Sequence, residues 1–366
     1  MLRKVDKTFL TITILLIVLG LFIFISASLG ILAKDESKFV SVLMSQIVLG
    51  IGAGVVVGII ALRVPILFWK RNAFFILIAA GVLCLLVFVP GLGFSHAGAR
   101  RWISLGPVSF QPAEFLKIAT VLYAAGWFSW IRNKVSDPKK SLFPVLGLIV
   151  ISGALLLPQP DTKSLILISV SVLTVAYVGG MKWKHIGLIA VLAIIAFTAV
   201  VLTRPYVMDR VKTFLHPGED KQGADYQVVQ SHIAIGSGKI FGRGLGQSVQ
   251  KFSYLPEPQG DSVFAVVGEE FGFIGSTLLI ILYVGFVLRG YHIASRTKDL
   301  FAKYLVVGII TLIGAQSFMN IASIIGVFPL TGVPLVFVSH GGTSLMLSIG
   351  MAAIVLKISK TMEHRA

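Results

Sequence analysis

Four of the sixteen acidic residues of this 366-residue chain fall in one short segment, YLPEPQGDSVFAVVGEEFGFIG, residues 254–275. They are Glu257, Asp261, Glu269 and Glu270, and a long apolar run follows them directly. A carboxylate beside an apolar helix can act as a general base, provided that burial raises its pKa above the ordinary value of about 3.9. The pattern marks Asp261 as a candidate catalytic or substrate-binding residue, and capping of the following helix is the competing interpretation.

A second group of charged residues lies in the segment GARRWISLGPVSFQPAEFLK, residues 98–117. Its Arg100 and Arg101 are typical of a membrane interface. Glu114 and Lys117 stand three residues apart, which places them on one face of a helix. Ionisable side chains inside a membrane are costly and usually functional, but a structural ion pair that fixes helix packing explains this pair equally well.

The composition indicates a membrane protein. Hydrophobic residues make up 56% of the chain, charged residues 13%, and the mean hydropathy is +0.90, whereas soluble domains carry roughly 25% charge. The net charge of +16 does not require a nucleic-acid partner, because cytoplasmic loops of membrane proteins collect Lys and Arg. The glycine strings GSGK and GRGLG lack the spacing of a nucleotide-binding loop. With one cysteine, Cys84, the chain can form no intramolecular disulfide.

The elements that must position the charged residues are membrane helices, each of which needs roughly 20 apolar residues. The motif PQPDTK, residues 158–163, divides two apolar runs, and its Asp161 is either a helix N-cap or a site residue. Reading those two runs as one broken helix would give nine spans. We expect an all-α polytopic protein of one domain, residues 1–366, with about ten membrane helices, near 9–31, 39–62, 73–90, 112–131, 142–158, 163–180, 184–203, 262–288, 303–327 and 334–356.

The distribution of basic residues predicts the orientation of these helices. Nineteen of the 32 Lys and Arg residues fall in segments on the same side as the N-terminus, which places both termini in the cytoplasm. The long polar segment 204–261 then lies on the outer face, between the seventh and eighth spans. Within it, Tyr226, Val229 and Ile233 recur at helical spacing and predict a helix at the membrane surface, while GRGLGQ predicts a glycine turn.

The motifs appear in an order that resembles the SEDS family (shape, elongation, division and sporulation). RRWISLG with QPAEFLK comes first, followed by LPQPD, by YQVVQSHIAIGSGKIFGRGLGQSVQKFSYLPEPQGDSVFAVVGEEFGFIG, and by PLTGVPLVFVSHGGTSLM. GRGLGQSVQK and GEE resemble the division member FtsW more than the elongation member RodA. Three stretches differ from the family pattern: PEAHTDFIFA is PEPQGDSVFA here, QPDLGT is QPDTKS, and SYGGSS is SHGGTS.

The resemblance implies a peptidoglycan glycosyltransferase that polymerises lipid II by inverting glycosyl transfer, with undecaprenyl pyrophosphate as the leaving group. Asp261 would be the general base. A divalent cation, Mg²⁺ or Mn²⁺, could assist the leaving group, although no spacing identifies a metal site. The residues expected to bind substrate are Lys117, Glu114, Arg100, Arg101, Arg210, Arg243, Lys251, Glu257, Asp161 and Ser339.

The same resemblance implies a place and partners. It predicts a protein of the bacterial cytoplasmic membrane with its active site on the outer face, active in septal cell-wall synthesis. A class B penicillin-binding transpeptidase and other division proteins are the expected partners, besides the lipid II and undecaprenyl-linked glycan substrates.

Two other functions remain open. A lipid II flippase would place essential polar residues along a path through both leaflets, and the pairs Glu114/Lys117 and Glu269/Glu270 keep this hypothesis open. A noncatalytic division scaffold would tolerate the loss of Asp261.

Overall fold

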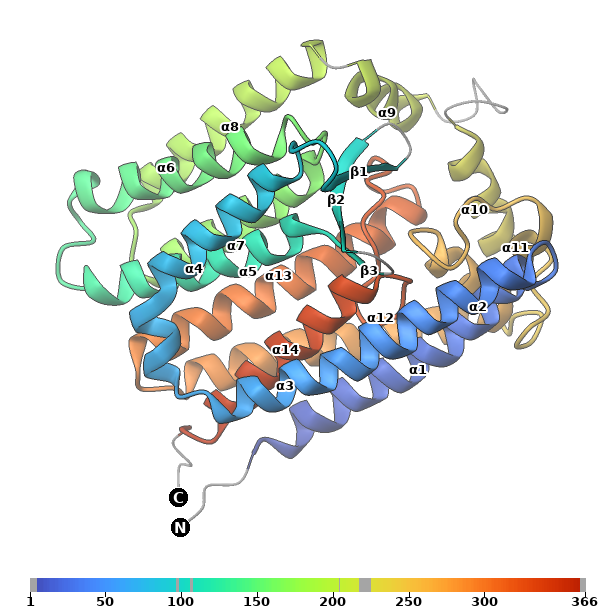
Figure 1. Ribbon diagram of the computed structural model, residues 1–366, viewed down its shortest axis with the longest axis horizontal. Coiled ribbons are helices and arrows are strands. Elements are labelled where there is room, and N and C mark those ends of the chain that lie inside the picture. The colour runs from blue at the N-terminus through green and yellow to red at the C-terminus, as the bar shows by residue number, and fades with distance from the viewer. Residues whose placement is uncertain (1–4, 97–98, 106–107, 204, 217–224, 363–366) are drawn as a thin grey trace.

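The computed structural model describes residues 5–96, 99–105, 108–203, 205–216 and 225–362. Within them, the ten expected spans are present as helical segments (Figure 1). They are α1 (Lys7–Leu32), α2 (Glu36–Met44) continued by the π-helical η1 (Ser45–Gly52) and α3 (Ala53–Arg63), α4 (Ile66–Leu86), α5 (Pro112–Trp130), α6 (Pro138–Leu156), α7 (Thr162–Val178), α8 (Trp183–Thr203), α12 (Val263–Ser295), α13 (Leu300–Ile324) and α14 (Gly342–Ser359).

Eight of these segments in the described chain are long and apolar enough to cross a membrane, while α7 is apolar but shorter. PQPDTK forms a turn between α6 and α7, so these are two helices and not one broken helix. Two predicted boundaries are wrong. The third span begins directly after Pro65 and not at residue 73, and the last begins at Gly342 and not at residue 334. Residues 325–341 instead form an irregular segment that enters the bundle.

A small antiparallel sheet joins α4 to α5, a feature that the hydropathy pattern did not predict. Its strands are β1 (Gly93–His96), β2 (Ala99–Leu105) and β3 (Val108–Phe110), in the order β1-β2-β3. The register places Ile103 opposite both Gly93 and Phe110. The Ile103 side chain is only 3% exposed, which holds the sheet against the end of the helical bundle.

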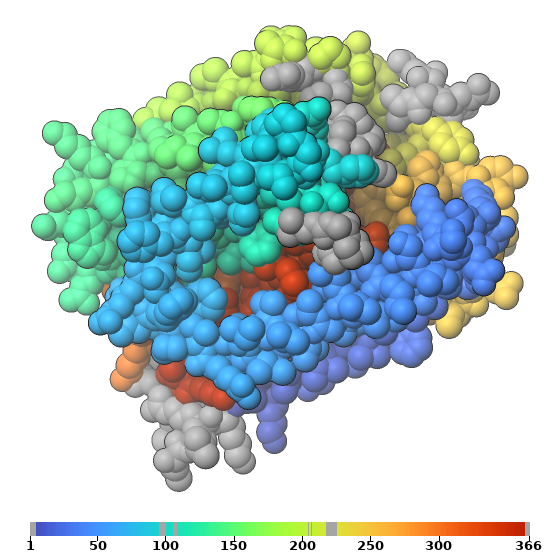
Figure 2. All heavy atoms as spheres, in the orientation of Figure 1, coloured from blue at the N-terminus to red at the C-terminus, as the bar shows by residue number. Residues whose placement is uncertain are grey.

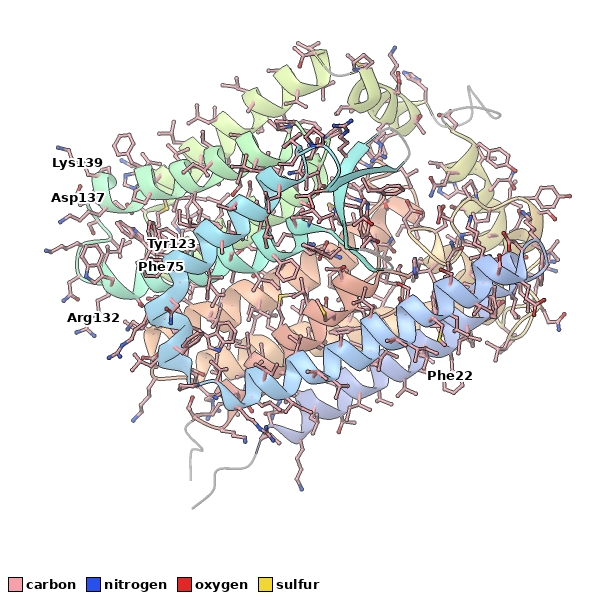
Figure 3. All side chains as sticks on the ribbon, in the orientation of Figure 1. Phe22, Phe75, Tyr123, Arg132, Asp137 and Lys139 are labelled. Atoms are coloured by element: carbon pink, nitrogen blue, oxygen red, sulfur yellow. The ribbon has the colours of Figure 1, made fainter. Side chains whose placement is uncertain are left out.

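The helices at the centre of the bundle are α13 and α14, each with 78% of its most apolar window buried. The peripheral helices expose apolar side chains outward, as Phe22 of α1 does in Figure 3. The backbone N–H of Asp6 donates to the hydroxyl of Ser359 at 3.0 Å. The beginning of α1 and the end of α14 are therefore neighbours. They lie on the same side of the bundle, as an even number of crossings requires.

Three short helices lie in the long segment between α8 and α12. They are α9 (Pro205–Leu215), α10 (Tyr226–Ser237) and α11 (Gln250–Ser253). The helix predicted from the spacing of Tyr226 is therefore confirmed as α10, and it packs against α12. In Figure 1, α10 and α11 lie at the right, at the end of the bundle opposite the turn between α5 and α6. Arg132, Asp137 and Lys139 of that turn project from the left edge of Figure 3.

Helix α12 is broken at Gly272, whose φ of 65° and ψ of −162° are not helical. The turn after α10 fills the break. Arg243 and Gly244 N–H groups donate to the carbonyls of Glu269 and Glu270 at 2.9 Å each, and the Phe273 N–H donates to the carbonyl of Lys239 at 2.9 Å. The helical groups left unpaired by the break thus find partners in the loop. We call residues 238–244 together with residues 268–272 the glycine clamp.

Glycines permit the close backbone approach within the glycine clamp. A Cβ at Gly238 would lie 1.9 Å from the carbonyl oxygen of Gly268, and one at Gly242, where φ is +81°, would lie 2.2 Å from that of Glu270. Both distances are far below van der Waals contact. The glycine turn predicted from GRGLGQ is confirmed, and its function is to let two backbones meet.

We predict that Gly238→Ala lowers the thermal unfolding temperature of the purified protein, because its new methyl group overlaps the Gly268 carbonyl. Overpacking of this kind costs about 1–3 kcal/mol. Gly236→Ala is the matched control, since a Cβ at this position in the last turn of α10 meets nothing within 4 Å. Equal unfolding temperatures for the two variants would contradict the steric account.

Candidate active site

A cavity of about 500 Å³ opens at the end of the bundle that carries the sheet. Its walls come from η1, the sheet, α5, α7, the turn before α12 and the segment before α14. Figure 2 shows it as a hollow between the blue η1 region and the cyan sheet, with the red of α14 at its floor. Its charged and polar lining includes Glu114, Lys163, Glu257, Asp261 and His340. We call this space the Asp261 cavity.

Asp261 lies two residues before α12 begins, half-buried in the cavity wall. Its side chain accepts a hydrogen bond from the Gln227 amide at 3.0 Å, and its backbone carbonyl accepts one from Asn320 at 2.8 Å. No side-chain cap bond is made by the N-cap residue of α12, which is Ser262. The competing interpretation, that Asp261 is present to cap the helix, therefore lacks support.

The surroundings of Asp261 raise its pKa. Burial is the largest influence and raises the pKa, and the nearby carboxylate of Glu257 raises it further. Lys163, the hydrogen bond from Gln227, and Arg210 act in the opposite direction without cancelling the effect of burial. A carboxylate whose pKa is raised is a better base than an ordinary aspartate.

Two cations approach Asp261 from different elements. Lys163 is near the N-terminus of α7, and its ammonium donates to the carbonyl of Gly332. Arg210 of α9 donates to the carbonyl of Leu330 at 2.9 Å. A Cβ built on Gly332 would lie 3.2 Å from Asp261 Oδ2 and 3.9 Å from both Lys163 Nζ and an Arg210 nitrogen. The carboxylate and both cations therefore converge on the same point.

Glu114 and Lys117 form the expected ion pair, at 2.8 Å. Lys117 is 2% exposed and donates a second bond to Gln316 at 2.7 Å, and Gln316 in turn donates to the carbonyl of Pro334 at 3.2 Å. Glu114 lines the Asp261 cavity. The pair thus links α5 to α13 and to the segment before α14, which supports the packing interpretation without excluding a role for Glu114 toward substrate.

Arg101 and Asp161 organise the turn between α6 and α7. Arg101 donates to the carbonyls of Gln159, at 2.8 Å, and Pro160. Asp161 is buried and caps α7, accepting bonds from the backbone and hydroxyl of Ser164 at 3.2 Å and 2.7 Å. The N-cap interpretation of Asp161 is confirmed. Arg100 is exposed on β2.

Lys251 and Arg243 lie outside the Asp261 cavity. Lys251 is fully buried against Glu270 at 2.6 Å, and the hydroxyl of Ser26 in α1 also donates to Glu270. Arg243 is 3.6 Å from Glu269, whose carboxylate accepts the Ser248 hydroxyl at 2.5 Å. Both glutamates of the opening segment are therefore paired, and they join the first half of α12 to the loop that precedes it.

Glu257 and Ser339 occupy different environments. Glu257 lines the cavity with an exposed side chain and a φ of 43°, a left-handed conformation that is uncommon for a residue other than glycine. Ser339 is buried, and its hydroxyl accepts the N–H of Leu335 at 2.8 Å. Its neighbour His340 stacks on Phe24 with ring centroids 5.9 Å apart, in agreement with a packing role.

Sequence reasoning missed three residues that lie next to Asp261. Gln227 and Asn320 hold its side chain and its backbone, and Lys163 shares its cavity. Gln316 and Asn320 are two amides four residues apart in the largely apolar α13, and this spacing was the available signal for Asn320. The sequence places Lys163 at a helix end. It gives no sign that Lys163 is close to Asp261, because the two residues are far apart along the chain.

The family model described as cell cycle protein, covering FtsW, RodA and SpoVE, matches residues 6–364. The chain belongs to this family. Stage V sporulation protein E of Bacillus subtilis is 34% identical over 358 residues, which is 97% of each chain. A probable peptidoglycan glycosyltransferase FtsW of Geobacter is 34% identical over 307 residues, which is 84% of each chain.

Solved structures of the FtsW/RodA/SpoVE family share the fold. A chain from a peptidoglycan synthase complex that coordinates polymerization and crosslinking superposes with a TM-score of 0.79 at 27% identity, covering 97% of both chains. The rod shape determining protein RodA of Thermus thermophilus gives a TM-score of 0.72 at 23% identity, covering 99% of this chain and 98% of that one. The chain is thus a multi-span membrane protein of known architecture.

We predict that Lys251→Met destabilises this family member by about 3–5 kcal/mol, because Glu270 would remain buried without its counter-charge. The double variant Lys251→Met/Glu270→Gln should recover part of that loss. Thermal unfolding in detergent measures both. Lys34→Met, at an exposed position, is the control and should change stability by less than about 0.5 kcal/mol. A single variant as stable as the control would disprove the structural role of the pair.

Proposed function

We propose that the protein is a peptidoglycan glycosyltransferase that polymerises lipid II. The observation that carries the proposal is Asp261, a carboxylate with a raised pKa that faces a cavity at the end of a membrane bundle beside two cations. The names of the FtsW relatives support the reaction class. Because the cavity opens at the end of the helices, lipid chains can remain in the bilayer while their sugars and phosphates enter it.

In the proposed reaction, the Asp261 carboxylate takes the proton from the 4-hydroxyl of the acceptor sugar. The acceptor oxygen then bonds to the anomeric carbon of the donor sugar from the face opposite the leaving group. The bond from that carbon to the diphosphate oxygen breaks, and undecaprenyl diphosphate leaves with the bonding electron pair. Configuration inverts in this single displacement. A positioned base contributes about 10²–10⁴-fold to such a rate.

The cations near Asp261 are suited to assist the departure of the diphosphate. Negative charge accumulates on the diphosphate as the glycosidic bond breaks, and a nearby guanidinium or ammonium stabilises that charge in the transition state. Arg210 is within reach of the point where Asp261 and Gly332 meet. Lys117 and Lys251, in contrast, are already ion-paired with Glu114 and Glu270. We therefore assign these two lysines a structural role and not direct contact with substrate.

A divalent cation is compatible with the proposed site. Within the described residues, no three His, Cys, Asp or Glu side chains converge to hold a metal. Mg²⁺ commonly takes one or two carboxylates and completes its shell with water and substrate phosphates. Glu257, in the cavity lining, would supply one carboxylate and leave Asp261 free to act as the base. Bound there, Mg²⁺ or Mn²⁺ would add positive charge for the leaving diphosphate.

The proposal includes a location and a partner. We place the protein in the bacterial cytoplasmic membrane with both termini in the cytoplasm, so that the Asp261 cavity faces outward. The support is the bias of Lys and Arg toward the end of the bundle where α1 begins. The similar chain from a synthase complex that couples polymerization to crosslinking favours a class B penicillin-binding transpeptidase as partner. A septal role, with other division proteins, is supported by the FtsW relatives.

The flippase hypothesis loses its main support in this geometry. The residues that kept it open were Glu114, Lys117, Glu269 and Glu270, and all four are buried and paired. Of these four residues, Glu114 lines the Asp261 cavity at one end of the bundle, so the four do not mark a path across the bilayer. Variants of Asp261 distinguish a scaffold from a polymerase, because a scaffold would tolerate the loss of this carboxylate and a polymerase would not.

We predict that Asp261→Asn reduces glycan formation from lipid II by at least about 10²-fold in proteoliposomes that contain the transpeptidase. The amide keeps the shape of the side chain but cannot take a proton. Glu36→Gln, which changes an exposed acid of α2, is the control for a loss of negative charge. Equal polymer from wild type and a correctly inserted Asp261→Asn protein would exclude Asp261 as the base.

We also predict the pH dependence of polymerisation. The base acts as a carboxylate, so the rate falls as pH decreases through the raised pKa of Asp261, and the midpoint lies above the ordinary value of about 3.9. Glu257→Gln should move this midpoint to lower pH, because the Glu257 carboxylate raises the pKa of Asp261. Initial rates measured across the acidic range test both. An unshifted midpoint in Glu257→Gln would show that another group controls the profile.

A further inference from the structure

We infer that Lys163 binds the diphosphate of the lipid-linked donor, forming with Arg210 an anion site beside Asp261. This inference rests on the proposed glycosyl transfer and extends it to a residue that the sequence pattern of the family does not provide. At this position the chain reads QPDTKS where the family pattern reads QPDLGT. In this structure Lys163 lines the Asp261 cavity and donates to the carbonyl of Gly332.

Opposing influences act on the Lys163 ammonium: the carboxylates of Asp161 and Asp261 attract it, while burial, Arg101 and Arg210 disfavour its charge. Lys163 is the second residue of α7, where the partial positive charge of the helix N-terminus repels a cation. The side chain is half-buried and lines the Asp261 cavity instead of extending into solvent. A cation kept at a helix N-terminus and turned inward is suited to an anionic ligand, which would interact favourably with the ammonium and the helix end together.

Lys163 retains hydrogen-bonding capacity. An ammonium group has three donors, and in the described part of the chain Lys163 donates to the carbonyl of Gly332. That bond fixes the direction of the side chain and leaves N–H groups for a ligand. Lysine acts on phosphate as a compact point charge, whereas arginine adds a planar fork. Lys163 and Arg210 thus offer two complementary contacts to the two phosphates of one diphosphate.

Gly332 lets the backbone approach the base and both cations closely. At this glycine φ is +62°, and a Cβ there would lie 3.2 Å from Asp261 Oδ2, closer than an ordinary contact, and 3.9 Å from each cation. A diphosphate bound by Lys163 within the Asp261 cavity would therefore lie beside the base that activates the acceptor. This places leaving group and base at neighbouring positions in one cavity, as a single displacement requires.

The test measures binding without turnover. Proteins carrying Asp261→Asn are reconstituted in nanodiscs, with Lys163 either retained or changed to Met or Arg, and are titrated with undecaprenyl diphosphate and with undecaprenol. Lys163→Met should weaken binding of the diphosphate lipid about 10–100-fold, the scale of a lost charge-assisted hydrogen bond, and leave undecaprenol unchanged. Lys163→Arg should retain most of the affinity. Lys212→Met, at an exposed position of α9, is the matched control and should bind like the parent.

Competition with inorganic pyrophosphate separates recognition of the anion from recognition of the lipid. Pyrophosphate should displace undecaprenyl diphosphate from the protein that retains Lys163 but not from the Lys163→Met variant at the same concentration. Equal affinities of these two proteins for undecaprenyl diphosphate would overturn the inference. An equal loss of undecaprenol binding would also overturn it, because it would show that the lysine supports the fold through Gly332.

The two proposals can fail separately. Polymerisation by the protein with Asp261 intact decides whether it is a glycosyltransferase, and the binding measurements in the Asp261→Asn background decide the role of Lys163. A polymerase whose Lys163→Met variant binds undecaprenyl diphosphate as well as the parent would retain the function and lose the anion site.

Discussion

The contact between two backbones in the glycine clamp is the constraint on which the rest of the site depends. Helix α12 breaks at Gly272, and the turn after α10 supplies hydrogen-bond partners on both sides of the break. The first half of the helix is therefore hydrogen-bonded to the loop where its own helical bonds are interrupted. Asp261 stands two residues before that half begins. The glycine clamp thus fixes the half-helix that follows Asp261, while Gln227 and Asn320 hold the residue itself.

Buried charges reinforce the same junction. Glu270, Lys251 and Ser26 connect α12 to α11 and α1, and Glu269 accepts bonds from the loop at Ser248 and Val249. Such groups are tolerated in an apolar interior because each has a partner of opposite charge or a hydrogen bond. Asp261 differs from them, since burial outweighs the attraction of its cations. Within one short segment, some carboxylates stabilise the fold while another is kept ready to accept a proton.

The sequence predicted the membrane helices well because twenty-residue apolar runs leave few alternatives in a bilayer. It also predicted the pair Glu114/Lys117, since three-residue spacing on a helix fixes their proximity. It could not predict the sheet before α5, whose strands are too short for a hydropathy signal. Lys163, Gln227 and Asn320 were missed for another reason. Each comes from a different element, so only the packed bundle brings them to Asp261.

Helix α8 differs from the other long helices in its isolation, with 6% of its most apolar window buried against the protein. Lipid thus surrounds most of its length, and the tilt of such a helix responds to the hydrophobic thickness of the bilayer. Helix α9, which carries Arg210, begins two residues after α8 ends. We therefore expect a change in bilayer thickness to act on α9 and on the hydrogen bond from Arg210 to the Leu330 carbonyl. The distance between the base and this cation would then depend on the lipid that surrounds α8.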